Sequence, residues 1–135
     1  MNAQQTTIAQ SCLAGAAEGT MSFPAIVKTL VENGFDGYAV DYRRNTTTYF
    51  LPDGEGLVLD NPHPAGTPVA EAFDEAGLVD QIKWAQSNPA DYSYTAFSDN
   101  VRRRGCAGYI VSVPGKRVLY YARTAETHVE PLPFL

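Results

Sequence analysis

Apolar residues in two segments of the chain recur with the spacing of an amphipathic helix. The first stripe consists of Phe23, Ile26, Val27, Leu30 and Val31, and the second of Tyr94, Phe97 and Val101. Ser22 and Ser93 stand where each helix would be capped, and Gly34 and Gly105 stand where a left-handed residue would end it. The pattern therefore predicts helices between Ser22 and Gly34 and between Ser93 and Gly105.

The period then changes to two, which is typical of strands. Alternating runs at 38–42 and 109–113 are each followed by a turn and by an aromatic run, at 47–51 and 117–122. A third short run follows at 57–59 and again at 128–130. Weaker helical patterns lie upstream, at 8–14 and 79–85. Each half of the chain thus predicts two helices, a hairpin and a short strand.

The two halves resemble each other in sequence. Residues 23–64 align with 94–135 at one constant offset and without a gap (105 − 34 = 71). Identical pairs are Ala25/Ala96, Gly34/Gly105, Gly37/Gly108, Tyr38/Tyr109, Val40/Val111, Tyr49/Tyr120, Glu55/Glu126, Val58/Val129 and Pro62/Pro133. We interpret this as internal duplication, with repeats at about 8–64 and 79–135.

This organisation predicts an α+β fold in a single domain, 1–135. Two half-exposed hairpins bury their apolar faces most simply in one antiparallel sheet with helices packed on one face, related by a pseudo-two-fold axis. A proline-rich linker and a helix at 61–78 would join the repeats. Thr67 and Pro68 are typical of a helix start.

Composition narrows the classes of partner. The 135 residues are 44% hydrophobic and 19% charged, and carry a net charge of −5. An acidic chain with no Lys/Arg run at either end disfavours nucleic acid. No apolar run approaches the roughly 20 residues of a membrane span, and the first basic residue is Lys28, so we expect no membrane contact and a cytoplasmic location. Cys12 and Cys106 are expected to be reduced thiols.

Four runs together resemble the YdfO-like family, a bacterial and prophage group of unknown function in which some members are labelled phage envelope protein. These runs are Gly37–Arg44, Thr48–Gly54, Gly105–Tyr109 and Arg123–Glu130. The resemblance covers about Ile8 to Pro133, with Ala125 standing where glycine is expected. It implies a small α+β domain of bacterial or prophage origin, but no activity, cofactor or catalytic residue.

Glu126, His128 and Glu130 form the most distinctive polar set. On a strand, residues at i, i+2 and i+4 share one face, and a Glu-His-Glu set can ligate a divalent metal. The equivalent positions in the first half are Glu55, Leu57 and Leu59, so the polar pair belongs to the second half alone. A metal site, a small-molecule site and a solvated strand face remain the alternatives.

No recognised catalytic motif is present. Cys106 and His128 could form a thiol–imidazole pair, but a cysteine directly after a helix end lies in a negative local field, which favours a buried, inert thiol. The run Arg102–Arg104 indicates either a solvated helix end or a phosphate-binding patch. The sequence therefore favours a protein that is not an enzyme and has no cofactor.

Tyrosines on paired strands offer a candidate ligand site. Tyr38, Tyr49, Tyr109 and Tyr120 could line a small cleft, with Arg123, Glu126 and His128 at its rim. The alternative is that these tyrosines are cross-strand pairs in the core.

The third strand of the first half suggests an interface. If Val58 and Val129 face the core, Leu57 and Leu59 point outward on an edge strand, which indicates dimerisation. We therefore hypothesise a non-enzymatic binding or interaction module, acting as a homodimer or with a protein partner. The second hypothesis is a small-molecule-binding domain, with or without enzymatic activity, whose site lies on the strand face of the second half. A structural phage component is the third.

Overall fold

A computed structural model describes all of residues 1–135, with four helices and six strands. The helices are α1 (Ala3–Glu18), α2 (Phe23–Glu32), α3 (Glu75–Ser87) and α4 (Tyr94–Arg103). The strands are β1 (Gly37–Asp41), β2 (Thr46–Phe50), β3 (Gly56–Asp60), β4 (Cys106–Ser112), β5 (Arg117–Ala122) and β6 (Thr127–Pro131). The predicted α+β class is confirmed. None of the four helices combines the length and apolarity that a membrane span requires.

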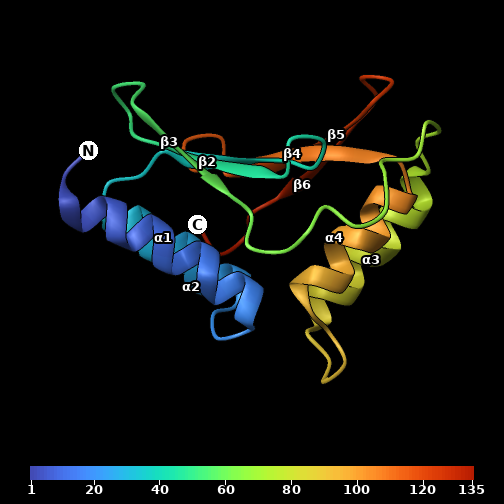
Figure 1. The fold of residues 1–135 in the computed structure, drawn as a ribbon, viewed down its shortest axis with the longest axis horizontal. Helices are drawn as coiled ribbons and strands as arrows, with labels where there is room; N and C mark the ends of the chain where they lie inside the picture. The colour runs from blue at the N-terminus through green and yellow to red at the C-terminus, as the bar shows by residue number, and fades with distance from the viewer.

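The strands form one antiparallel sheet in the order β3-β2-β1-β4-β5-β6, so the first strands of the two halves pair at its centre. All four helices lie on the same side of this sheet, α1 beside α2 and α3 beside α4 (Figure 1). Sheet and helices thus form two layers, as the hairpin argument predicted. The other face of the sheet has no helix against it.

The pairing of β1 with β4 is symmetric about one residue pair. Ala39 is opposite Ile110, while Tyr38 is opposite Val111 and Val40 is opposite Tyr109. Because Tyr38 and Tyr109 are equivalent in the aligned halves, as are Val40 and Val111, a local two-fold axis through the central pair exchanges them. The halves also repeat the same order of elements. An origin by duplication stays a prediction from the sequence.

The predicted ends of α2 and α4 are confirmed. The hydroxyl oxygens of Ser22 and Ser93 each accept a hydrogen bond from the backbone N–H three residues later. Gly34 (φ 84°) and Gly105 (φ 87°) take the left-handed conformation just after the helices.

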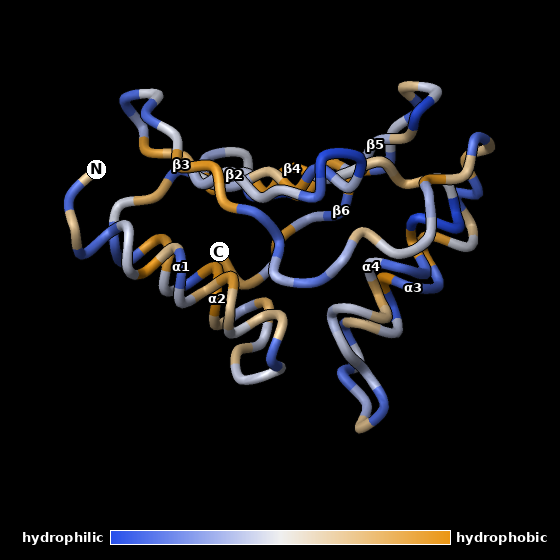
Figure 2. Tube along the Cα trace, in the orientation of Figure 1, coloured by the Kyte–Doolittle hydropathy of each residue, from blue (hydrophilic) through white to orange (hydrophobic).

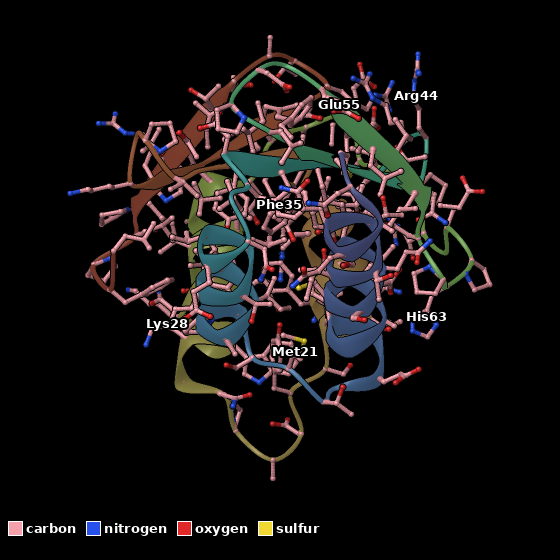
Figure 3. The ribbon with its side chains drawn as sticks, turned by 90° about the vertical axis from the view of Figure 1, so that its left-hand side faces the viewer. Met21, Lys28, Phe35, Arg44, Glu55 and His63 are labelled. Atoms are coloured by element: carbon pink, nitrogen blue, oxygen red, sulfur yellow. The ribbon has the colours of Figure 1, made fainter.

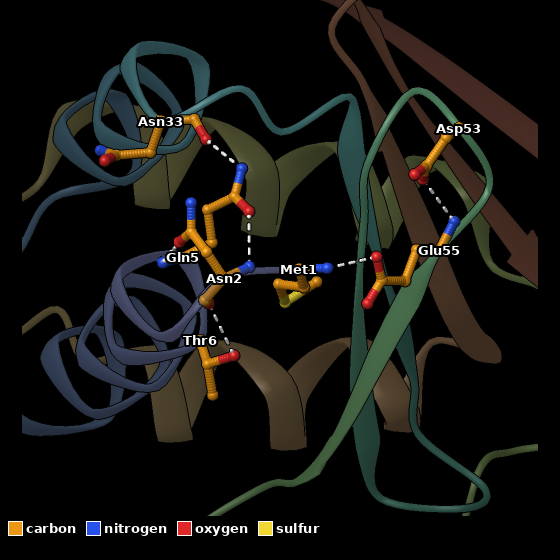
Figure 4. A network of polar contacts seen from close by, with 7 residues as sticks. All are labelled: Met1, Asn2, Gln5, Thr6, Asn33, Asp53 and Glu55. Atoms are coloured by element: carbon orange, nitrogen blue, oxygen red, sulfur yellow. Dashed lines mark hydrogen bonds and ion pairs between the residues drawn. The ribbon is translucent and has the colours of Figure 1, made fainter.

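The first helix is longer than the pattern at 8–14 predicted. Asn2 and Gln5 form a capping box at its start, and the Gln5 amide also donates to the backbone oxygen of Asn33 at 3.0 Å (Figure 4). The Met1 amine, just ahead of the helix, contacts the Glu55 carboxylate in the turn before β3. These contacts attach the start of α1 to α2 and to the sheet.

The helix start at Thr67-Pro68 was predicted wrongly. The chain from 61 to 74 is not helical, and α3 begins at Glu75, where an Asp74 carboxylate oxygen accepts the N–H of Gly77 at 2.9 Å. The connection instead runs past the end of α4, because Ala70 N–H donates to Arg102 O and Asp74 N–H to Arg104 O. Those bonds fix the linker against the end of α4, and the Asp74 cap starts the helix at Glu75.

The core lies between the sheet and the helices. Its most completely buried large side chains are Leu30, Leu78, Val27, Val40, Val101 and Val111, which come from three helices and the two central strands. Figure 2 shows hydrophobic segments along the helices and strands, while the outlying turns are largely hydrophilic. Phe35, only 3% exposed, lies between the helices and the sheet (Figure 3).

Candidate functional site

The four predicted strand tyrosines lie in the core. Tyr38, Tyr49, Tyr109 and Tyr120 all point to the helix side and are at most 8% exposed. Their rings pair across strands, with centroids 5.5 Å apart for Tyr38 and Tyr49 and 5.4 Å for Tyr109 and Tyr120. Burial raises the pKa of all four hydroxyls well above the usual value. These residues therefore form core pairs, and they do not line an open cleft.

Arg123 and Glu126 do not join these tyrosines. The Arg123 guanidinium donates to the backbone oxygen of Val69 at 3.1 Å, which fastens the linker to the end of β5. Glu126 is exposed and accepts a hydrogen bond from the Thr124 hydroxyl at 2.7 Å. It precedes β6, in a turn where Ala125 is left-handed (φ 66°), so the i, i+2, i+4 argument fails at this residue. Glu126, His128 and Glu130 form no metal-binding group.

His128 instead bridges two carboxylates. Its Nδ1 lies 2.9 Å from a Glu75 oxygen at the start of α3, and its Nε2 lies 2.7 Å from a Glu130 oxygen on the same strand. Burial alone would lower the pKa of His128, but the hydrogen bonds to Glu130 and Glu75 outweigh it and raise the pKa. The arrangement ties α3 to the edge of the sheet and leaves neither ring nitrogen free for catalysis.

Cys106 is unsuited to nucleophilic chemistry. Its thiol is fully buried and contacts the backbone oxygen of Gly108 at 3.3 Å. Burial raises the pKa of the Cys106 thiol to about 12, so almost none is thiolate at neutral pH. Since His128 is held by two carboxylates, the two residues do not form a catalytic pair.

The predicted orientation of the third strands was wrong. Leu57 and Leu59 are partly buried against the core, whereas Val58 is 62% exposed and Val129 is 44% exposed. Leu57 pairs with Tyr49 and Leu59 with Thr47, and both partners face the helices. A five-residue strand alternates equally well in either orientation, so its period did not indicate which side faces the core. The outward apolar residues are the valines.

These valines end an apolar row that crosses the whole open face of the sheet. Successive cross-strand partners in the row are Val58, Thr48, Ala39, Ile110, Leu119 and Val129. Every strand contributes one residue, and only Thr48 is polar. Six large apolar residues of the molecule are exposed, and four lie on this face: Phe50, Val58, Ile110 and Val129. The open face is therefore where exposed apolar side chains gather. We call the six paired residues, one from each strand and running from Val58 to Val129, the central row.

The two rows of residues beside the central row differ in charge. On one side, Phe50 and Arg117 lie in the adjacent row of paired positions, and on the other side lie Asp41, Asp60 and Tyr121. The sheet thus presents an apolar centre with a cationic and an acidic border, which is the anatomy of an interface core and its rim.

A pocket lies on the helix side, between α1 and α4 and against the linker. It has a cavity volume of about 30 Å³. Its polar lining comes from Tyr42, Asn45, Asn61, Tyr94, Thr95, Ser98 and Arg102, and His63 also lines it. Figure 3 shows His63 beside α1, and its Nε2 lies 3.5 Å from the backbone oxygen of Ala17.

Arg102 is the residue that the sequence argument missed. Arg103 and Arg104 do lie at the surface, where they pair with Asp99 at 2.9 Å and Asp74 at 3.2 Å. Arg102 is only 6% exposed and makes no ion pair. A signal was present in the aligned halves, because Ser98 and Arg102 occupy the places of Val27 and Val31. Residues at i and i+4 lie on the same face of a helix, so two polar residues within an apolar stripe indicate a polar site inside the fold.

The sequence matches no family model, and no curated protein matches it either. Membership of the YdfO-like family therefore stays a prediction.

Proposed function

We propose that the protein is a non-enzymatic interaction module that forms a homodimer through the open face of its sheet. The central row is the observation that carries the proposal. Single exposed apolar residues are common on protein surfaces, but a contiguous apolar patch with a polar border marks an interaction site. Here the patch spans six strands and includes Ile110, 43% exposed at the centre of the sheet.

The internal symmetry of the face favours a second copy as its occupant. A two-fold axis parallel to the strands would stack β1 of one chain on β4 of the other, with sheets about 10 Å apart. Ala39 would then face the partner's Ile110, and Thr48 the partner's Leu119. At these two contacts a larger side chain meets a smaller one, because the halves differ in size there, and at the ends of the row Val58 would face the partner's Val129.

The flanking residues fit the same arrangement. Phe50 would face the partner's Arg117, which suits a cation over an aromatic ring. Asp60 would face the partner's Thr127 and Asp41 the partner's Gly108. No like charges meet, so the border does not oppose association.

The dimensions of the face suit a dimer. Six strands about 4.8 Å apart and at least five residues long, at about 3.3 Å each, give a flat area of roughly 29 Å by 17 Å. Side-chain relief increases the accessible area beyond this flat value, toward the roughly 800 Å² per partner of a standard interface.

Other features support a binding role over catalysis and suggest where the protein acts. His128 and Cys106, the candidate catalytic groups, are held in structural contacts. Both cysteines are free and buried, which fits the reducing cytoplasm. The resemblance to the YdfO-like family adds a bacterial or prophage origin to the proposal.

The test is the oligomeric state of two matched variants. Ile110→Lys places a charge in the central row, and Val31→Lys places one on α2, at a residue of similar exposure (39%). In sedimentation velocity, wild type and Val31→Lys should form a concentration-dependent dimer, and Ile110→Lys should be monomeric with an unchanged circular dichroism spectrum. A monomeric wild type at hundreds of micromolar, or a dimeric Ile110→Lys, would overturn the proposal.

A further inference from the structure

We propose that the pocket around Arg102 binds the carboxylate group of a small organic acid. The pocket lies on the helix side of the molecule and is separate from the open face. It brings a buried guanidinium together with hydroxyl and amide groups from α4, from the turn after β1 and from the linker.

The state of Arg102 is the first argument. Its side chain is more than nine-tenths buried, and its Nε has no hydrogen-bond partner. Its Nη2 makes one long contact, 3.4 Å, to the side-chain oxygen of Asn45. The guanidinium lies over the Tyr42 ring, 4.8 Å from its centroid. Burial has removed water from the Arg102 guanidinium, and one long bond to a neutral oxygen does not make up for the lost hydrogen bonds. An anion bound at this place would therefore gain a strong charge-assisted interaction.

The carboxylate of Asp99, which interacts electrostatically with Arg102, is already engaged elsewhere. Asp99 pairs with Arg103 at 2.9 Å and accepts the N–H of Thr67 at 3.1 Å. Hydrogen bonding from Thr67 is the main cause that lowers the Asp99 pKa, with smaller effects from Arg103 and Arg102. Asp99 therefore affects Arg102 electrostatically, without a hydrogen bond to it. The Nε–H group of Arg102 stays unpaired.

The polar lining supplies further donors. The Tyr42 hydroxyl makes a long contact, 3.4 Å, with the Ser98 hydroxyl, so a closer acceptor can compete for it. The Tyr94 hydroxyl is 2.6 Å from that of Tyr109, which anchors it at the pocket wall. Asn45 is held by its amide, which donates to the backbone oxygen of His63 at 2.8 Å. The lining is thus fixed in position before any ligand arrives, which lowers the cost of binding.

The size of the pocket selects the class of anion. A single water needs roughly 10–15 Å³ on a comparable scale, so a cavity of about 30 Å³ holds only a few atoms. A carboxylate has three heavy atoms and is planar, as is the guanidinium that it would meet. Leu13, Pro62 and Pro64 border the same pocket and offer an apolar wall to the organic part of the acid.

The same place in the other half has none of these groups. Positions equivalent to Ser98 and Arg102 are Val27 and Val31, and the position equivalent to Asn61 is the buried Leu132. The pocket therefore breaks the symmetry of the halves by replacing apolar residues with polar ones. Burying polar groups costs stability, so the replacement points to binding rather than to packing.

The experiment compares acids with neutral amides of the same shape. Propionate and propionamide, at equal ionic strength, would be titrated into the full chain and followed by amide chemical shifts and thermal stability. We expect propionate to shift resonances around Arg102 and raise the melting temperature, and propionamide to do neither. Arg102→Met should weaken propionate binding at least about tenfold, and Arg103→Met, at the neighbouring exposed arginine, should not.

Two further variants complete the test. If Arg102→Met does not fold, Tyr42→Phe keeps the ring and removes only the hydroxyl, and it should weaken binding severalfold. The monomeric Ile110→Lys variant should bind propionate like wild type, which separates this proposal from dimerisation. Equal responses to acid and amide, unchanged binding by the folded Arg102 or Tyr42 variant, or tighter binding of inorganic phosphate than of propionate would overturn the proposal.

Discussion

Ala39 pairs directly with Ile110 at the centre of the six-stranded sheet, and both side chains lie on the face that no helix covers. On the other face, the neighbouring pairs Tyr38/Val111 and Val40/Tyr109 are buried beneath the helices. The central strands therefore serve two purposes with alternate residues. One set builds the core, and the other builds the surface that we assign to a second copy of the chain.

The orientation of β3 predicts different costs for two adjacent substitutions. Leu57→Thr should lower the free energy of unfolding by roughly 1 kcal/mol, because full burial of a leucine contributes about 1.5–3 kcal/mol and Leu57 is partly buried. Val58→Thr should change it by less than about 0.5 kcal/mol, because Val58 is exposed. Urea denaturation measures both, and threonine keeps the β-branched shape at Val58.

This comparison needs a background without dimer linkage, since association adds to apparent stability. Both substitutions are therefore to be made in the Ile110→Lys variant. A larger loss for Val58→Thr than for Leu57→Thr would mean that β3 faces the other way.

The bridge at His128 predicts that stability depends on pH. Its pKa is raised in the folded chain, so the protonated form favours folding. This contribution is fully present below the unfolded value of about 6.5 and is lost as pH rises through the higher folded value. The urea midpoint of wild type should therefore fall more steeply with rising pH over this window than that of His128→Gln.

Glu75→Gln removes one of the two carboxylates and should give an intermediate slope. The reason is that Glu130 still contacts Nε2 at 2.7 Å. Parallel profiles for wild type and His128→Gln would show that the bridge does not form in solution.

Burial predicts that both thiols are unreactive in the native chain. Cys12 is 1% exposed and Cys106 is 0% exposed, and burial raises the pKa of each thiol. A thiol reagent at pH 8 should modify neither residue until denaturant is added, and then both. Rapid modification of Cys106 in the native chain would contradict its buried position. The variant Cys12→Ser leaves Cys106 as the one thiol, so any modification seen in it belongs to Cys106.

Much of the fold could be predicted because local signals agreed with one another. The apolar stripe between Ser22 and Gly34, its caps and the change to a period of two all indicated the same helix and strand, and its copy near Ser93 repeated them. The start of α3 could not be predicted in this way. Thr67 and Pro68 have the right local chemistry, but bonds from the linker to the end of α4 outweigh it.

The sites were harder to predict because they depend on which side a residue faces. Alternation on β3 is the same for either orientation, and only pairing with Tyr49 and Thr47 settles that Leu57 and Leu59 face inward. Arg102 was hidden within a run of three arginines. Arg103 and Arg104 are exposed, and only the packing of α4 against the pocket distinguishes Arg102 from them.

The central claim is that Ala39 of one chain faces Ile110 of the other. Ala39→Glu and Ile110→Lys should each be monomeric, because each would bring like charges together near the two-fold axis. An equimolar mixture should form a heterodimer, because glutamate at 39 then faces lysine at 110 while the second contact stays as in wild type. Sedimentation velocity of the two variants and of their mixture measures this directly. A species of twice the monomer mass in the mixture alone is the predicted result, and a mixture that stays monomeric, or single variants that still dimerise, would contradict the account.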